Sequence, residues 1–331
     1  MNDEVMEQLK KDPFIKLWEG NFNQNYLSGL LEAKRSKPLN YLVNTKPYSQ
    51  IPVVLVVAGP SLDTNIEYLK DYQNNCIIIC ADICLFKLLE NNIKPDFVCT
   101  IDPHEISKSF YTDLKTEDLT LVCPTTSNPT GLNEWKGNIL FYNQEDYKGS
   151  PKDIALKKML KPIEGWHTLF NRFFVGATMF QIASLMNPTE IILVGYDFSY
   201  RDKKPYCDGV LKRRSKWEIE TIYKDFERTY SDEEFITRRT QENTDFEYNQ
   251  KNLEIDKNGI TWETKNNLKL YKDVFVELIL KSGLTVINST EGGIMTHCPE
   301  RSLKQSLELY CKNVIKKVDI FNYVPKRRGR R

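Results

Sequence analysis

Glycine and polar residues that could hold a phosphate follow short apolar runs at several points of this 331-residue chain. The clearest case is Gly59-Pro60-Ser61, directly after the apolar run VVLVV at 53–57. A glycine lets the backbone approach a ligand, and a serine hydroxyl beside the free N–H groups of a helix start suits a phosphate. Later runs are followed by Asp82, Asp102, Thr125, Thr126, Ser127, Asn128, Gly195, Asp197, Asn288, Ser289, Thr290, Gly292 and Gly293. We predict that these residues form one nucleotide-binding site, although any single one could instead cap a helix or make a turn.

A general base for the chemistry could come from four residues. His104 and His167 carry imidazoles, whose ordinary pKa lies near neutral pH, and Asp102 and Glu291 are carboxylate alternatives. The sequence does not rank these four candidates. We expect no metal site, because the three histidines are dispersed and none of the eight cysteines forms a CxxC pair.

The elements that position these residues alternate between strand and helix patterns. Unbroken β-branched runs such as residues 53–57 are typical of strands buried on both faces of a parallel sheet. Further strands are expected at 76–80, within 96–105, and at 119–123, 138–142, 190–195 and 284–287, with helices at 63–70, 81–93, 174–187 and 268–281. The pattern predicts an α/β fold with a doubly wound, mostly parallel, Rossmann-like sheet. In such a sheet the loops at the carboxyl ends of the strands form one rim, where ligands bind.

The chain divides into three parts by composition. Residues 1–45 are interpreted as an N-terminal helical extension, 46–311 as a Rossmann-like catalytic domain for a nucleotide or nucleotide-sugar, and 312–331 as a basic tail. Within the domain, residues 201–265 hold 14 basic and 15 acidic residues, which predicts a charged helical insertion or lid rather than a part of the sheet. The tail holds eight basic residues against Asp319, whereas the whole chain has a net charge of only +1.

The composition and the missing motifs exclude several classes of protein. Apolar residues make up 40% of the chain, which is enough for a core, but no run approaches the ~20 residues that span a membrane. The eight cysteines lie mostly beside apolar runs and are expected to be buried free thiols in a cytoplasmic protein. No P-loop motif, no G-x-G-x-x-G after the first run and no G-x-S-x-G occurs. Nucleic acid is not an expected partner, because terminal basic runs are commonly solvated, and homo-oligomerisation is left open.

Four blocks of sequence carry a resemblance to a known family. They are VVAGPSLD, ICADICLFKLLENNIKPDFVCTIDPHE, FVGATMFQIASLMNPTEIILVGYDFSY and INSTEGGI, in this order. Over about residues 25–200 and 266–300 the chain resembles the domain shared by bacterial motility accessory factors (Maf proteins) and archaeal 6-hydroxymethyl-dihydropterin pyrophosphokinases, the MptE-like family. The Maf branch glycosylates flagellin Ser/Thr with nonulosonic acids, and its core fold is similar to that of sialyltransferases that use CMP-activated donors. The resemblance implies that Gly59, Pro60 and Ser61 line the nucleotide phosphate and that Asp82 and residues 125–128 lie near the nucleoside.

The two branches of this family imply different chemistry. Pyrophosphokinases of this type carry two neighbouring aspartates after the third strand, which hold Mg²⁺ against ATP phosphates. This chain has Ile101-Asp102-Pro103, with a single aspartate, as the Maf-type segment does. We therefore expect a glycosyltransferase with no tightly bound cofactor, which moves a sialic-acid-like sugar from a CMP donor to a flagellin-like Ser/Thr or a glycan hydroxyl. The alternatives are a Mg²⁺-dependent pyrophosphokinase that uses ATP on a pterin-like substrate, and a non-catalytic nucleotide-binding interaction protein.

Overall fold

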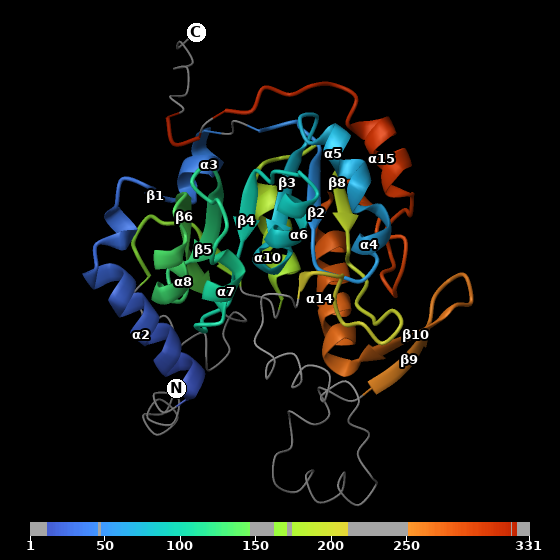
Figure 1. Cartoon of the computed structure of the whole chain (residues 1–331), viewed down its shortest axis with the longest axis horizontal. Helices are drawn as coiled ribbons and strands as arrows, with labels where there is room; N and C mark the ends of the chain where they lie inside the picture. Colours follow the sequence, from blue (N-terminus) through green and yellow to red (C-terminus); the bar gives the residue numbers. More distant parts are fainter. Residues whose placement is uncertain are drawn as a thin grey trace, which may run out of the picture.

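A nine-stranded sheet forms the centre of the molecule in a computed structural model (Figure 1), which describes residues 12–45, 48–145, 162–170, 174–210, 251–318 and 320–322. The strands of this sheet are β1 (Ser36–Pro38), β2 (Val53–Val56), β3 (Ile77–Ala81), β4 (Phe97–Cys99), β5 (Thr120–Pro124), β6 (Asn138–Glu145), β7 (Thr168–Phe170), β8 (Ile191–Val194) and β11 (Val286–Asn288). Their order is β1-β6-β5-β4-β3-β2-β8-β11, with β7 beside β6, and the pairings are parallel. This arrangement confirms the predicted α/β fold with a Rossmann-like sheet.

The strand order reverses between β2 and β8. From β2 the chain adds β3, β4, β5 and β6 on one side, and it then returns to place β8 and β11 on the other side. Val53 of β2 pairs with Ile77 of β3 and with Ile191 of β8. At such a switch point the connections leave toward opposite faces of the sheet, and a crevice opens at the carboxyl ends of the two central strands.

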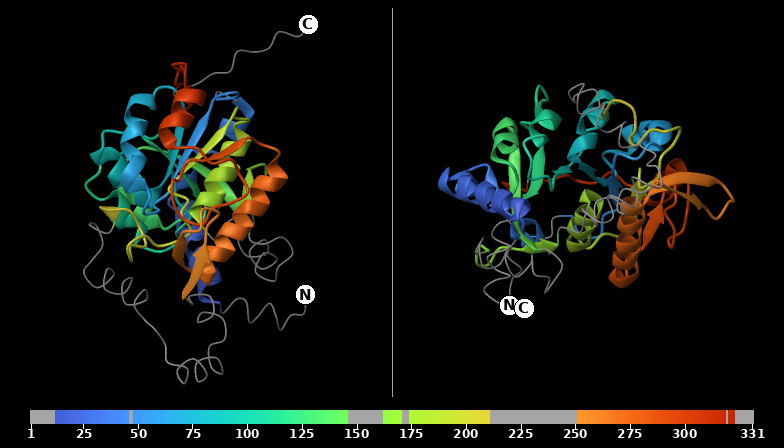
Figure 2. Two further views of the ribbon diagram at one scale, coloured as in Figure 1. Left: turned by 90° about the vertical axis from the view of Figure 1, so that its right-hand side faces the viewer. Right: turned by 90° about the horizontal axis from the view of Figure 1, so that it is seen from below.

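Helices cover both faces of the sheet. They are α2 (Pro13–Leu27), α3 (Asn40–Thr45), α4 (Leu62–Asn65), α5 (Leu69–Tyr72), α6 (Leu85–Glu90), α7 (Ser107–Tyr111), α8 (Pro129–Glu134), α10 (Val175–Leu185), α14 (Asn266–Ser282) and α15 (Leu303–Tyr310), with 3-10 turns η1 (Leu30–Glu32), η2 (Ile66–Tyr68) and η3 (Asp82–Cys84). Figure 2 shows α10 and α14 on one face and α6, α7 and α8 on the other. Among the described residues, no helix is both long enough and apolar enough to cross a bilayer.

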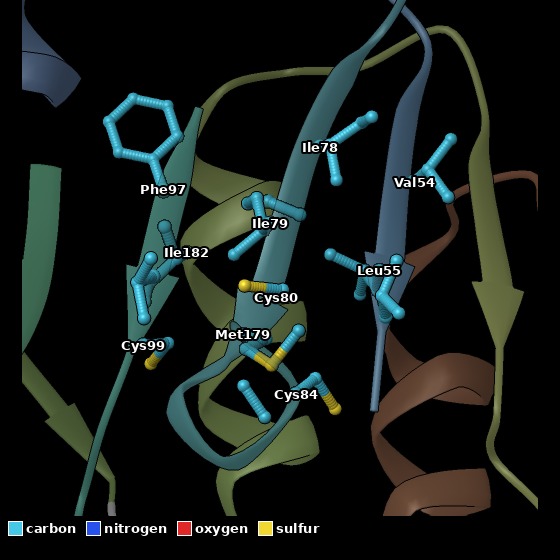
Figure 3. Close-up of a cluster of buried hydrophobic side chains, with 14 of the residues drawn as sticks. Val54, Leu55, Ile78, Ile79, Cys80, Cys84, Phe97, Cys99, Met179 and Ile182 are labelled. Atoms are coloured by element: carbon cyan, nitrogen blue, oxygen red, sulfur yellow. The ribbon is translucent and has the colours of Figure 1, made fainter. Parts of the chain in front are cut away.

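The core lies between the central strands and α10 (Figure 3). The residues of β2 and β3 are all buried, and Met179 and Ile182 of α10 pack against these strands. All eight cysteines are free and seven of them are buried, as the sequence predicted. Burial holds the pKa of the Cys80 and Cys99 thiols well above its ordinary value, so these side chains act as small apolar groups.

The N-terminal segment is more than a helical extension, and the predicted boundary at residue 45 is wrong. Its helix α2 is capped by Asp12, whose carboxylate accepts hydrogen bonds from the N–H groups of Phe14 (2.9 Å) and Ile15 (3.2 Å). The segment then forms β1, which pairs with β6 at the edge of the main sheet. The sequence Ser-Lys-Pro of this strand contains no apolar run, so its backbone pairing leaves no hydrophobic pattern to detect.

The charged segment 201–265 is not helical throughout, which corrects the sequence interpretation. Residues 251–265 form an antiparallel hairpin of β9 (Lys251–Ile255) and β10 (Thr261–Lys265). Gly259 takes a φ of +80° in the turn between these strands, where glycine has no steric penalty. The dense charge of the whole segment obscured this local pattern. Residues 211–250 lie outside the described part of the chain, so a lid there stays a prediction.

Part of the predicted basic tail packs against the body of the protein. The stretch after α15 runs across the amino-terminal ends of the strands, along the top of Figure 1. The Ile315 N–H donates to the Asn74 carbonyl at 2.9 Å, and the Lys317 Nζ lies 2.7 Å from the Asp96 Oδ2. The tail therefore does not begin at residue 312, while Asp319 and residues 323–331 lie outside the described residues.

Candidate functional site

A cavity of about 390 Å³ lies at the switch point of the sheet. Residues that follow four strands line it: Gly59 after β2, Asp82 after β3, Asp102 after β4, and Gly195 and Asp197 after β8. The rest of the wall is largely apolar, and its aromatic residues are Phe110, Phe174, Tyr196, Phe198, Tyr206 and Tyr271. The structure thus brings five of the predicted site residues to one cavity, because parallel strands end at the same edge. We call it the switch-point cavity.

The turn at Gly59-Pro60-Ser61 is held by a carboxylate of the protein. Ser61 is buried; its Oγ donates to the Asp197 Oδ2 at 2.7 Å, and its N–H donates to the Asp197 Oδ1 at 3.1 Å. A Cβ on Gly59 would lie 1.9 Å from the Asp197 Oδ2 and 2.2 Å from the Gly195 carbonyl oxygen. Gly59 is therefore required for packing between the β2 and β8 loops. Both Ser61 groups expected at a phosphate are instead bound to Asp197.

Asp197 is the most unusual titratable group of the cavity. It is almost completely buried and yet lines the switch-point cavity. Burial raises the pKa of the Asp197 carboxyl to about 6, against the lowering effects of the Ser61 hydrogen bonds and of the Arg201 charge. This carboxyl can therefore exchange a proton close to neutral pH. The sequence predicted Asp197 only as a binding residue, because nothing in the neighbouring residues indicates that its carboxyl is buried.

Asp102, which lines the cavity, forms a pair with His104, whose side chain is exposed. The His104 Nδ1 lies 2.9 Å from the Asp102 Oδ1, and the His104 backbone N–H donates to the same oxygen at 2.8 Å. The imidazole also packs edge-on against Phe14 of α2, with ring centroids 5.7 Å apart. A carboxylate at Nδ1 favours the tautomer with its proton on that nitrogen, which leaves Nε2 able to accept a proton. This geometry suits one of the predicted general bases.

The other two candidate bases lie elsewhere. The backbone of His167 joins two elements, since its N–H donates to the Asn40 side chain and its carbonyl accepts from the Asn143 N–H at 2.9 Å. Partial burial lowers the pKa of the His167 imidazole, and this residue does not line the switch-point cavity. The Glu291 Oε1 accepts from the Asn65 Nδ2 (3.1 Å) and from the Leu303 N–H (2.8 Å). Glu291 therefore ties α4 to the start of α15, and it does not line the switch-point cavity.

The loop of residues 125–128, expected near a nucleoside, lies under helix α2. The Asn25 Nδ2 donates to the carbonyls of Thr125 (3.0 Å) and Ser127 (2.9 Å), and the Asn21 Nδ2 donates to that of Thr126 (3.0 Å). Asn128 caps α8 through its Oδ1. None of these four loop residues lines the switch-point cavity. A polar loop after a strand gives no sign that a distant helix covers it.

The loop of residues 288–293 does reach the same rim as the first turn. The Asn65 Nδ2 donates to the Ser289 carbonyl at 3.1 Å across 224 positions of sequence, and the Thr290 Oγ1 accepts from the Tyr196 N–H at 3.1 Å. The Ser289 hydroxyl lies 2.7 Å from that of Ser306. Residues Asn288, Glu291, Gly292 and Gly293 line a second cavity of about 620 Å³. We call it the hairpin cavity, because the β9–β10 hairpin forms another part of its wall.

The carboxylates of the switch-point cavity make hydrogen bonds within the protein. Among the described residues, no three His, Cys, Asp or Glu side chains are grouped so as to hold a metal ion. The Asp102 Oδ1 is bound by His104, and both Asp197 oxygens accept hydrogen bonds from Ser61. The Asp82 Oδ1 accepts the N–H of Ile83 at 2.8 Å. The expectation of a reaction without a metal, in contrast to the Mg²⁺ that a pyrophosphokinase would need, stays a prediction.

Comparisons with known proteins agree with this architecture. The family model described as "6-hydroxymethylpterin diphosphokinase MptE-like" matches residues 24–203, which include all five residues of the rim in the switch-point cavity. A MAf glycosyltransferase from Magnetospirillum magneticum AMB-1 has a similar fold, with a TM-score of 0.54 and 16% sequence identity. The similarity covers 81% of this chain but only 39% of that protein. No curated protein matches the chain.

Proposed function

The chain belongs to the MptE-like family, and we propose on this basis that it is a transferase whose donor binds in the switch-point cavity. The more specific proposal is a glycosyltransferase that moves a sialic-acid-like sugar from a CMP-activated donor to a hydroxyl. The acceptor would be a Ser or Thr of a flagellin-like protein, or a glycan. The fold that the chain shares with a MAf glycosyltransferase supports this direction, although that protein is only 16% identical.

One observation carries the proposal: Asp102, which lines the cavity at the switch point, is paired with the exposed imidazole of His104. In the proposed reaction, the acceptor hydroxyl gives its proton to the His104 Nε2 while its oxygen bonds to the anomeric carbon of the donor. The bond from that carbon to the phosphate oxygen breaks, and its electron pair leaves with the CMP phosphate. Asp102 holds the Nδ1 proton and stabilises the imidazolium that forms.

The rest of the cavity suits the other parts of such a donor. Phe174 and Tyr271 stack with centroids 5.5 Å apart, and Phe198 packs edge-on against Phe174, which makes a rigid apolar wall. Such a wall can bury a planar base or the apolar side of a sugar ring. Asp197, whose pKa is raised to about 6, is mostly ionised at neutral pH, and the two hydrogen bonds from Ser61 hold its carboxylate in place beside the donor.

The direct test measures release of CMP from CMP-N-acetylneuraminate and related CMP-nonulosonates, with and without an acceptor protein. We expect His104→Asn to lower the rate about 100-fold or more, since a general base contributes roughly 10²–10⁴. His297→Asn is the matched control, because His297 is also an exposed histidine but its Nδ1 lies 2.6 Å from the Thr296 Oγ1 and not beside a carboxylate that lines the cavity. Equal activity of the wild type and His104→Asn would refute the assigned base. Equal loss in both variants would mean that the effect is not specific to the site.

A diphosphokinase is the second candidate, because the description of the family names that activity. Three aspartates line the switch-point cavity, and the described residues hold no group of three His, Cys, Asp or Glu side chains that could bind a metal ion. A thermal-shift comparison separates the two functions, because a ligand that binds only the folded state raises its stability. We expect CMP to stabilise the protein more than ATP does, with EDTA present or absent. A larger shift with ATP that requires Mg²⁺ would overturn the glycosyltransferase proposal.

A further inference from the structure

The hairpin cavity lies between the β9–β10 hairpin, the loop after β11 and the start of α15. Its wall includes Arg201, Trp262, Asn288, Ser302 and Gln305. The hairpin projects at the lower right of Figure 1, next to the loops that follow β8. A Cβ on Gly292 would lie 3.5 Å from both the Asp197 Oδ1 and the Trp262 Cη2. Gly292 therefore stands where the two cavities come nearest to one another.

Most charges in the wall of the hairpin cavity already have partners. The Lys257 Nζ lies 2.7 Å from the Glu300 Oε2, and the Asp256 Oδ2 accepts the indole N–H of Trp262 at 2.9 Å. Glu291 is bound by Asn65 and by a backbone N–H. All three acidic side chains in this wall are thus engaged by the protein itself.

The two arginines of the wall are different. Neither Arg201 nor Arg301 forms an ion pair with any carboxylate in the part of the chain that the structure describes. The Arg201 Nη1 is buried and has no hydrogen-bond partner, while its guanidinium lies 6.0 Å from the centre of the Trp262 ring. A buried donor that is left unsatisfied destabilises the folded protein, and more so when it is charged. The position of Arg201 therefore points to an anion as the missing partner.

The backbone around both arginines is well fixed. The Tyr200 N–H donates to the Glu263 carbonyl at 2.7 Å, which holds the residue before Arg201 against β10. The Arg301 N–H donates to the Asn288 carbonyl at 3.0 Å, and the following Ser302 caps α15. Two cations thus extend from two separate, anchored segments into one cavity. Such an arrangement resembles a built binding site more than a solvated surface.

We propose that the hairpin cavity binds a small polyhydroxylated anion, such as a sugar acid or a sugar phosphate. The anionic group would bind to Arg201 and Arg301, because a guanidinium matches the geometry of a carboxylate or a phosphate. The sugar ring would pack near Trp262, and Asn288 and Gln305 offer hydrogen-bond donors and acceptors to its hydroxyls. This inference does not depend on which donor the switch-point cavity binds.

The test titrates the full-length protein with glucuronate, glucose 1-phosphate, inorganic phosphate and glucose by isothermal calorimetry. We expect at least one of the two sugar anions to bind at least tenfold more tightly than glucose and than inorganic phosphate. Arg201→Gln and Arg301→Gln should each weaken that binding about tenfold, since hydrogen bonds to charged groups are worth roughly that much. Arg301 is exposed, so its variant tests the site even if the partly buried Arg201 is needed for folding.

Two control variants make the result specific. Lys281→Gln removes a cation that pairs with Glu277 on α14, away from the cavity, and Asp102→Asn alters the switch-point cavity. Neither variant should change the binding of the sugar anion. If the proposed transferase function is wrong, Asp102→Asn will keep the wild-type rate of CMP release, and that result does not bear on binding in the hairpin cavity. The inference is overturned if glucose or phosphate binds as tightly as both sugar anions, if none binds saturably, or if both arginine variants bind like the wild type.

Discussion

Replacing Asp197 with asparagine should remove a penalty that the folded protein carries at neutral pH. The pKa of this buried carboxyl is raised from 3.8 to about 6, so the folded chain binds the proton more tightly than the unfolded chain does. The free energy of unfolding should then fall as the pH rises from about 4 to about 6 and stay lower above that range. At about 1.4 kcal/mol for each pKa unit, the shift to about 6 corresponds to roughly 3 kcal/mol.

The asparagine can keep both hydrogen bonds to Ser61. Its Oδ1 can accept the Ser61 N–H, and its Nδ2 can donate to the Ser61 Oγ, because a hydroxyl can act as an acceptor. The variant should therefore match the wild type at pH 4 and exceed it by up to about 3 kcal/mol at pH 7.5. We would measure urea unfolding of both proteins between these pH values at constant ionic strength.

A matched control replaces an exposed carboxylate with its amide. Asp118 is mostly exposed and lies 3.8 Å from Lys94, so Asp118→Asn should differ little from the wild type at every pH. If the difference in unfolding free energy between Asp197→Asn and the wild type does not change with pH, the assigned titration of Asp197 is wrong. A variant that is less stable than the wild type at pH 7.5 would also refute the reasoning.

Three further substitutions test other parts of the fold. Gly59→Ala should lower the free energy of unfolding by about 3 kcal/mol, because its Cβ would lie 1.9 Å from a carboxylate oxygen. Gly20→Ala on α2 is the control, since its Cβ meets nothing within 4 Å, and it should be neutral or stabilising in thermal unfolding. Asn25→Leu should destabilise the protein by about 2 kcal/mol in urea, since it leaves two buried carbonyls of the loop after β5 without a donor; wild-type stability would contradict the role of α2. Burial raises the pKa of Asp96 and the neighbouring lysine lowers it, so Lys317→Met should raise this pKa further. The loss in unfolding free energy should therefore be largest near pH 7, where Asp96 is charged, and should shrink in acid. A loss of the same size at every pH would argue against this ion pair.

The sequence by itself determined the sheet and the position of its rim. Residues 53–56, 77–81 and 191–194 are unbroken apolar runs, and such runs are stable as strands only where both faces of a parallel sheet are covered. The polar residues Asp82 and Asp197 come directly after two of these strands, so the edge on which they meet follows from the parallel topology. Local pattern was sufficient because each of these features depends on neighbours in the chain.

Only the tertiary structure decided which of these polar groups face a cavity. Ser61 and Asp197 lie 136 positions apart, and their hydrogen bond turns a predicted phosphate ligand into an internal contact. The Asn25 side chain likewise donates hydrogen bonds to two loop carbonyls that lie 100 and 102 positions further along the chain. Hydrophobic periodicity reports which residues are buried within one element, but it holds no information about the partner of a polar atom. That partner depends on how loops from different strands pack, and the same packing leaves the Arg201 Nη1 buried without a hydrogen-bond partner.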